Sequence, residues 1–153
     1  MAARWGTDCN QWPNRPAAGG VANAVTARVV ADGPGAWRID VSANGVADLG
    51  AWEFALDIGG DAVVDDVTLG AFPASTGRAF TALPLEKRPG QLSLAALSLG
   101  AALPGASGSG VLASLRATGA EPPAVAVADA LLVDTAGNRI TPMVRLYLPA
   151  VGR

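Results

Sequence analysis

The stretch from Gly45 to Gly70 constrains the fold of this chain most, because its apolar and polar residues alternate. Four large apolar side chains occupy every second position: Trp52, Phe54, Leu56 and Ile58. A period of two is typical of a strand with one face on a core and the other in water. The dipeptide Gly59-Gly60 predicts a turn, after which the alternation resumes at Val63, Val67 and Leu69. The stretch therefore predicts a hairpin in an antiparallel, all-β domain.

The composition agrees with this fold class. The 153 residues suit one domain that buries its own core. Apolar residues make up 50% of the chain and aromatic residues only 5%, so aliphatic side chains must form most of the core. The 19 glycines and 11 prolines leave room for short strands and little room for long helices. No apolar run reaches the roughly 18 residues that a membrane-spanning helix needs.

Charge and residue usage exclude several functions. Eleven basic and thirteen acidic residues give a net charge of -2 without a basic stripe, which argues against nucleic-acid binding. The chain has no histidine, so it lacks Ser-His-Asp and Cys-His catalysis and histidine-ligated zinc. The sequence predicts that the protein is no enzyme and holds no cofactor.

Further alternating segments follow the same pattern along the chain. They cover residues 24–31, 37–41, 63–69, 77–83, 91–99, 111–117, 124–133 and 139–148. With the Trp52 segment they predict about nine strands, spaced as in a sandwich or jelly roll. Turns are expected at Asn44-Gly45 and at 134–138, a β-bulge at Ala96-Leu97, and loops at 84–90 and 103–110.

The inward phase of each predicted strand defines an expected core. Its members alternate with polar or small residues in their own segments: Trp37, Ile39, Val41, Trp52, Phe54, Leu56, Val111, Leu115, Val125 and Val127. A single core containing them would make one domain.

The two ends are expected to lie outside that domain. Residues 1–23 form an N-terminal arm, because Pro13 and Pro16 prevent a regular central strand there. Its Trp5 and Trp12 either pack back on the sandwich or contact a neighbour, and burying such a ring is worth a few kcal/mol. Residues 24–142 form the sandwich and 143–153 a C-terminal strand or tail. We take Trp5, Trp12 and Tyr147 as candidate partner-binding residues.

The N-terminal segment carries two further features. Cys9 is the only cysteine, so an intermolecular disulfide or a reactive thiol is possible in principle, but an incidental free cysteine is favoured. No apolar segment of a signal peptide is present. Taken literally, this indicates a cytoplasmic protein, but it is equally compatible with a processed chain whose export signal was removed.

Calcium is the only metal ion for which the sequence offers a case, because it binds several clustered oxygens. Two groups could supply them: Asp48, Asp57 and Asp61 in the predicted hairpin, and Asp129, Asp134 and Asn138 near the later turn. For the first group we favour solvated carboxylates, and for the second side chains that cap their own turn. Asp65 and Asp66 are adjacent in a strand, so they are expected on opposite faces and not as a catalytic pair.

Four segments in order carry a resemblance to a known family: VADLGAWEFALDI, VDDVTLGAFPASTGRAF, GSGVLASLRA and LLVDTAGNRI. Together they resemble cohesin domains, over about residues 24–142. The resemblance is nearest to the cohesin-like domains of exported proteins from filamentous, often thermophilic bacteria. It implies a nine-stranded jelly-roll β-sandwich that binds proteins, in an extracellular or cell-surface location.

One turn departs from the family pattern. Cohesins usually have a Tyr-Asp-Pro-like turn where this chain has residues 57–61, DIGGD. The variable dockerin-binding surface of the family cannot be transferred to particular residues here, so a cellulosomal role is not implied. The ending around Tyr147-Leu148-Pro149 is similar to that of many exported proteins from the same bacteria, although it also fits a last strand with a frayed end.

Two non-catalytic functions compete at this point. The first is a protein–protein interaction module that binds another protein or copies of itself, through a terminal arm or strand added to a neighbour's sheet edge. Such exchange would produce an open-ended filament. The second is a carbohydrate-binding module, which needs an exposed aromatic strip. Glycan binding stays possible, although Trp37 and Trp52 have the inward phase of core residues.

Overall fold

A computed structural model describes residues 25–83, 86–99 and 102–140, and all of its regular elements are strands. The eight strands are β1 (Val25–Ala31), β2 (Ala36–Gly59), β3 (Val63–Leu69), β4 (Phe80–Ala82), β5 (Glu86–Arg88), β6 (Gln91–Ser98), β7 (Ala106–Thr118) and β8 (Ala124–Asp134). Every strand pairing is antiparallel. The all-β prediction is confirmed, whereas the count of nine strands is not.

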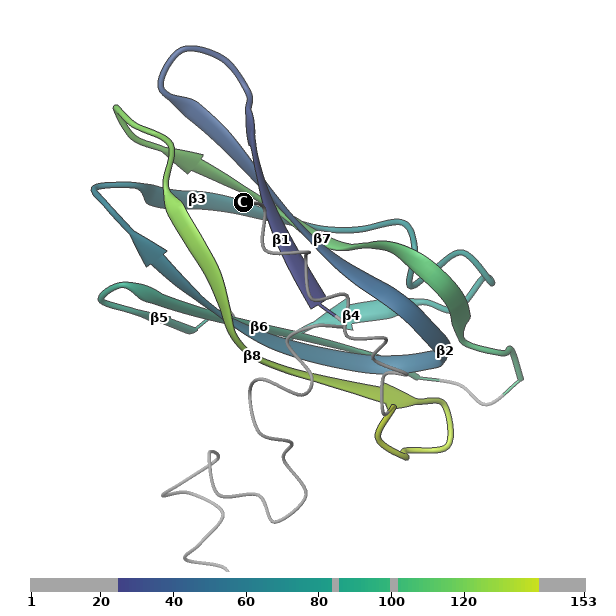
Figure 1. Cartoon of the computed structure of the whole chain (residues 1–153). Helices are drawn as coiled ribbons and strands as arrows, with labels where there is room; N and C mark the ends of the chain where they lie inside the picture. Colours follow the sequence, from purple (N-terminus) through teal and green to yellow (C-terminus); the bar gives the residue numbers. More distant parts are fainter. Residues whose placement is uncertain (1–24, 84–85, 100–101, 141–153) are drawn as a thin grey trace, which may run out of the picture.

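The long strand β2 belongs to both layers of the sandwich (Figure 1). Its first half, up to Ala43, lies between β1 and β7, and β3 pairs with the other edge of β7. Its second half, from Ala51, lies between β8 and β6, and β4 and β5 pair with β6. The first sheet is thus β1-β2-β7-β3, and the second is β8-β2-β6 with β4 and β5 beyond.

The turn expected at Asn44-Gly45 is wrong. The chain does not reverse there, and β2 continues through a bend with register shifts between Ala43, Val46 and Leu49 relative to β7. Gly45 has a φ of 63° and Asp48 a φ of 55°. Two left-handed residues and a bulged register bend a strand without ending it, which is how a single strand passes from one sheet into the other.

The hairpin predicted between Gly45 and Gly70 is also wrong. Both of its strands exist, but β3 pairs with β7 of the first sheet and not with the half of β2 that precedes it. The turn at Gly59-Gly60 therefore leads the chain from one sheet to the other. Gly60 has a φ of 90°, which favours glycine there.

Several element boundaries differ from the sequence prediction. The expected loop 103–110 contains the start of β7 at Ala106, and the expected loop 84–90 contains β5. The segment 77–83 contributes only the three residues of β4. The register of β6 on β2 runs without a shift through Ala96 and Leu97, so the β-bulge predicted there is wrong.

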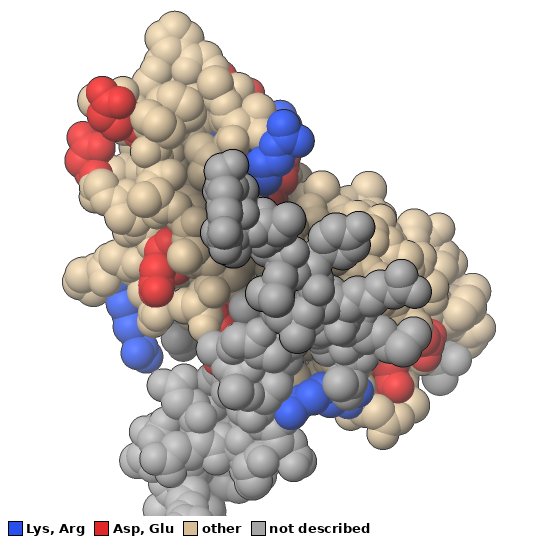
Figure 2. Space-filling view, viewed as in Figure 1, with Lys and Arg blue, Asp and Glu red and all other residues tan. Residues whose placement is uncertain are grey.

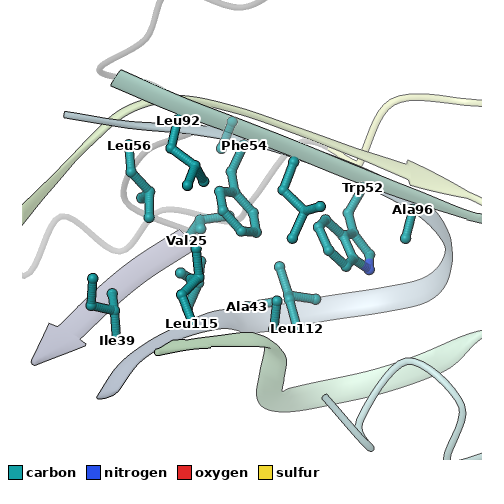
Figure 3. Close-up of a cluster of buried hydrophobic side chains, with 14 of the residues drawn as sticks. Val25, Ile39, Ala43, Trp52, Phe54, Leu56, Leu92, Ala96, Leu112 and Leu115 are labelled. Atoms are coloured by element: carbon teal, nitrogen blue, oxygen red, sulfur yellow. The ribbon is translucent and has the colours of Figure 1, made fainter. Parts of the chain in front are cut away.

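The core lies between the two sheets and matches the inward phases of the strands (Figure 3). Six predicted core residues are buried: Ile39, Val41, Trp52, Phe54, Leu56 and Leu115. Trp37, Val125 and Val127 pack against the core while partly exposed. The prediction that Val111 is a core residue is wrong, because a register shift relative to β2 places its neighbour Leu112 in the core instead. The rings of Trp52 and Phe54 stack with centroids 5.3 Å apart.

The predictions for the two ends of the chain are not tested by the structure. Trp5, Cys9, Trp12 and Tyr147 lie outside the described residues. Of the last predicted strand only Arg139 and Ile140 are described, and both contact β8, through the bridge from Arg139 to Val133 and the hydrogen bond from the Ile140 N–H to the Leu132 carbonyl. Within the described part of the chain, no helix is long and apolar enough to span a membrane.

Candidate interaction face

The outward side of the second sheet carries small and apolar residues from three neighbouring strands. Residues across the register share a face, so Ala51 lies between Leu97 and Val133, and Glu53 lies between Ala95 and Leu131. We call this the apolar face and define it as Ala51, Glu53, Ala55, Ser93, Ala95, Leu97, Leu131 and Val133. All but Ala55 are partly exposed.

Glu53 lies at the centre of the apolar face, and Asp129, the cross-strand neighbour of Ala55, is a second carboxylate on the same side of the sheet. Its cross-strand neighbours are Ala95 on β6 and Leu131 on β8. Among the described residues, none is hydrogen-bonded or ion-paired to the Glu53 side chain. A carboxylate surrounded by alanine and leucine is available to a cation brought by another molecule, and small neighbours let that molecule approach the sheet closely.

The outward side of the first sheet has the opposite chemistry. The register places mostly polar or charged residues there, together with the apolar Val30, Val63 and Val111: Thr26, Arg28, Arg38, Asp40, Ser42, Asp66, Thr68, Ser114, Arg116 and Thr118. We call this the charged face. Arg38 Nε donates to both oxygens of Asp40, at 3.0 and 3.1 Å, and Ser114 Oγ donates to Asp40 Oδ1 at 2.7 Å. These groups satisfy one another within the sheet.

The face drawn in Figure 2 carries no large area of one charge sign. Figure 2 shows separate red and blue side chains on the face in view, with wide uncharged areas and no field of one sign. This agrees with the near balance of eleven basic and thirteen acidic residues.

Asp48 holds the bend of β2 against two loops. Its N–H donates to Ser107 Oγ at 3.0 Å, and its Oδ1 accepts from the Gly105 N–H at 2.6 Å. Its Oδ2 accepts from the Thr135 hydroxyl at 2.5 Å, and its carbonyl accepts from the Thr135 N–H at 3.0 Å. The bend is thus tied to Gly105 and the first residues of β7, and to the turn after β8. This fixes where the apolar face begins.

The same contacts lower the pKa of Asp48. The hydrogen bond from Thr135 contributes most, followed by that from Gly105, because both favour the ionised carboxylate. The charge of Arg78 adds a smaller effect in the same direction. Arg78 is itself buried, and it donates from Nε to Ser98 Oγ at 2.9 Å and from Nη1 to the Leu103 carbonyl.

Glycine is required where this bend meets its neighbours. A Cβ on Gly50 would lie 2.5 Å from the Asp134 carbonyl oxygen, and one on Gly105 would lie 2.4 Å from both Asp48 C and Leu49 O. These contacts are with backbone, which cannot move aside as a flexible side chain can. The close approach therefore depends on the absence of side chains.

The structure separates the first set of predicted calcium ligands. Asp48 is engaged at the bend, whereas Asp57 lies nine residues further along β2 and accepts a hydrogen bond from Gln91 Nε2 at 3.2 Å. Nine strand residues span about 30 Å, so these carboxylates cannot share an ion. Within the described residues, no group of three His, Cys, Asp or Glu side chains is placed to hold a metal.

The second set of candidate calcium ligands, Asp129, Asp134 and Asn138, makes local hydrogen bonds, as expected from the sequence. Asp134 Oδ1 accepts from the N–H groups of Ala136 and Asn138, at 2.9 and 2.8 Å. Asp129 Oδ1 accepts from the Ala130 N–H at 2.8 Å. These carboxylates shape the backbone around β8.

The prediction that Asp65 and Asp66 point to opposite faces is wrong. A register shift between Val64 and Asp66 places an extra residue on β3, and both carboxylates are exposed. A β-bulge interrupts the alternation on which the prediction depended.

The apolar face was not predicted from the sequence. One signal was available at Leu97, an apolar residue in the outward phase of β6, which was interpreted as a slip in register. Leu131 carries the same signal on β8. The candidate residues named from the sequence, Trp5, Trp12 and Tyr147, lie outside the described residues, so the structure does not place them on or off this face.

A scan against protein-family models and a search of curated proteins each give no match. Solved structures do match. A non-cellulosomal cohesin from the archaeon Archaeoglobus fulgidus aligns with 76% of this chain and 82% of its own, at 16% identity and a TM-score of 0.58. A cohesin of scaffoldin B from Acetivibrio cellulolyticus, solved with a Cel5 dockerin, aligns with 76% of this chain and 89% of its own, at 15% identity and a TM-score of 0.62.

A third match comes from Clostridium thermocellum. The cohesin of a type I cohesin–dockerin complex aligns with 77% of this chain and 90% of its own, at 17% identity and a TM-score of 0.60. The chain has a cohesin-like fold. This confirms the resemblance given by the four sequence segments, and at these identities the likeness concerns the fold alone.

Proposed function

We propose that this chain is a non-catalytic protein–protein interaction module and that the apolar face is its docking surface. The observation that carries the proposal is the difference between the two faces. On the charged face Asp40 is bonded to Arg38 and Ser114 within the sheet, whereas the apolar face presents Leu97, Leu131 and Val133 around small side chains. These side chains are half-buried in the free molecule, and apolar residues gathered on one sheet face in this way can be covered by a protein partner.

The structural neighbours support a protein as the partner. Cohesins of the same fold were solved in complexes with dockerin modules. The partner that fits the apolar face presents an apolar surface with one basic side chain opposite Glu53. A buried charge pair of this kind gives specificity, because a partner without the cation leaves the carboxylate desolvated and unpaired.

Three finer features belong to the proposal. The module acts outside the cell or on its surface, as its sequence resemblance implies. It also assembles with copies of itself through a terminal segment, which could build a filament. Trp5, Trp12 and Tyr147 are its candidate residues for such contacts.

Carbohydrate binding receives no support from the described residues. Trp52 and Phe54 are buried, and Trp37 is partly buried with its Nε1 donating to the Gly119 carbonyl at 3.1 Å. Among the described residues, the exposed large hydrophobics are aliphatic: Val63, Leu83, Leu99 and Leu103. The glycan alternative would depend on Trp5 and Trp12 alone.

The test is a screen of the full chain against a displayed library of the secreted proteins of its source organism and a panel of dockerin modules. Binders are then measured by biolayer interferometry with two matched variants. Leu131→Glu places a charge on the apolar face, and Val30→Glu places the same charge on an outer strand of the charged face. We expect Leu131→Glu to weaken binding about 10- to 100-fold, as at interface hot spots, and Val30→Glu to change it little.

Two results would overturn the proposal. One is the absence of any binder with a Kd below about 10 µM, since a specific interface of standard size should reach that affinity. The other is binding that survives Leu131→Glu but is lost with Val30→Glu, which would assign the function to the charged face. Circular dichroism of both variants checks that they are folded.

A further inference from the structure

Arg139 lies at the edge of the apolar face and is oriented as the members of that face are. It forms an antiparallel bridge with Val133, and residues paired in this way share a face of the sheet. The next residue agrees with this orientation, because Ile140 packs against the core, on the opposite side of the backbone. The row across the sheet is therefore Leu97, Ala51, Val133 and Arg139.

The Arg139 side chain has no polar partner in the free molecule. No hydrogen bond or ion pair joins it to another described residue, and its Nε is buried without a hydrogen-bond acceptor. A guanidinium in this state gains most from a carboxylate, which can accept two of its N–H groups at once. Glu53 is in the matching state, because none of the described residues binds its carboxylate. The apolar face thus carries one unpaired anion and one unpaired cation.

Glu53 and Arg139 do not pair within one molecule, and apolar side chains lie between them. Leu131 is the cross-strand neighbour of Glu53, and Val133, two residues further along β8, is the neighbour of Arg139. The two charged positions are therefore two strand spacings apart across the sheet and two residues apart along it. These spacings separate their Cα atoms by about 12 Å.

This arrangement is complementary to itself. A partner that fits the apolar face needs an apolar surface with a cation opposite Glu53 and a carboxylate opposite Arg139, about 12 Å apart. A second copy supplies all of these when it is related to the first by a two-fold axis that lies in the interface and passes between Leu131 and Val133. Glu53 of each copy then faces Arg139 of the other, and Leu131 and Val133 of both copies pack together at the axis.

Asp129 is the other carboxylate on this side of the sheet, and it is engaged locally. Its Oδ1 accepts from the Ala130 N–H at 2.8 Å. It lies four residues along β8 from Val133, which places it about 14 Å from Arg139, further than Glu53. The Glu53 carboxylate is therefore the one that a guanidinium from another molecule completes.

We propose that the apolar face binds the apolar face of a second copy of this chain, in a two-fold symmetric dimer held by two Glu53–Arg139 pairs. The inference rests on the proposed function, because it names one partner of the same docking surface. The face has fewer members than the roughly 20–30 residues per side of a stable interface. The dimer is therefore weak, with a Kd between about 10 µM and 1 mM, and it leaves the face accessible to another protein.

The experiment is sedimentation equilibrium of the full chain at concentrations up to about 1 mM. Glu53→Arg places two cations opposite each other in both pairs, and Arg139→Glu places two carboxylates there. Each variant alone should dimerise about tenfold more weakly or worse, as expected for close charge pairs at an interface. An equimolar mixture of the two variants should dimerise about as tightly as the unchanged chain, because every pair then joins opposite charges. The chain with both substitutions should also dimerise with itself.

Three further variants separate charge at this face from charge elsewhere and from folding. Thr68→Arg adds a cation to the charged face, and Asp129→Asn removes the other carboxylate beside the apolar face, so both should leave dimerisation unchanged. Arg139→Met keeps the apolar part of the side chain and removes its charge, and it should weaken dimerisation even if Arg139→Glu does not fold. Circular dichroism checks the fold of every variant.

A chain that stays monomeric up to about 1 mM would overturn the proposal. So would single variants that dimerise as the unchanged chain does, or a mixture that fails to restore what they lose, since Glu53 and Arg139 would then not face each other. Loss of the dimer with Asp129→Asn and not with Glu53→Arg would overturn it as well. Partner binding is measured separately with Leu131→Glu, so a monomeric chain that binds another protein through the apolar face retains the proposed function.

Discussion

The two outer faces of this sandwich share the strand β2 and differ in the chemistry of their side chains. Before the bend, β2 contributes Arg38, Asp40 and Ser42 to the charged face, where Asp40 is bonded to Arg38 and to Ser114. After the bend, it contributes Ala51, Glu53 and Ala55 to the apolar face. The comparison shows that one strand can present hydrogen-bonded polar residues on one side of a bend and apolar residues on the other.

The largest expected effect comes from the core that both faces share. Phe54 is 1% exposed and stacks on Trp52, so Phe54→Ala should lower the free energy of unfolding by about 3–5 kcal/mol. Urea denaturation followed by circular dichroism measures it. Both faces should be lost in one transition, and two separate transitions would show that the sheets are independent units.

Reversing the charge of the apolar face should affect binding more than folding. Glu53→Lys repels the basic side chain that we propose for the partner, and an affinity loss of about tenfold or more is expected. Stability should change by less than about 0.5 kcal/mol, as for other surface substitutions. Biolayer interferometry and urea denaturation give the two values. Unchanged affinity would remove Glu53 from the interface.

The matching reversal on the charged face should have the opposite profile. Asp40→Lys adds a fourth cation beside Arg28, Arg38 and Arg116 and removes the acceptor of Ser114. The expected cost is about 1 kcal/mol of stability, in the range for cross-strand charge pairs, with partner affinity unchanged. Added salt should reduce that cost. A larger effect on affinity than on stability would break the distinction between the faces.

The mildest test changes only the pH. The pKa of Asp48 is lower in the folded protein than its usual 3.8, so the unfolded chain takes up the proton first. The stabilisation is therefore complete well above pH 3.8 and is lost as the pH falls through the folded pKa. Asp48→Asn should show a flatter decline in unfolding free energy between about pH 5 and pH 2. An equal slope in both proteins would mean that other carboxylates dominate.

The alternation of apolar residues was sufficient to predict the fold class and most of the core. Ile39, Phe54 and Leu115 could be assigned because each lies in a strand that keeps its phase. The errors occur where phase changes locally. Val111, Asp65 and the bend after Ala43 all lie at register shifts, and a bulge is set by the partner strand as much as by the local sequence.

The strand pairings and the apolar face could not be predicted from the sequence, for a related reason. Nothing local to Val63–Leu69 specifies that β3 pairs with β7 and not with the strand before it. The apolar face combines residues near 53, 95 and 131 that only the sheet order brings together. Each contributes an alanine, a leucine or one glutamate, and none is remarkable within its own segment.

The shared strand β2 also determines when this protein can fold. Its partners β7 and β8 lie far along the chain, so closing their loops must precede most of the favourable burial. When β1 to β6 have left the ribosome, the first half of β2 still lacks β7 on one edge and the second half lacks β8. Folding should therefore wait for the last third of the chain and take milliseconds to seconds, as in other all-β domains. During that interval β2 is the segment most in need of protection from aggregation.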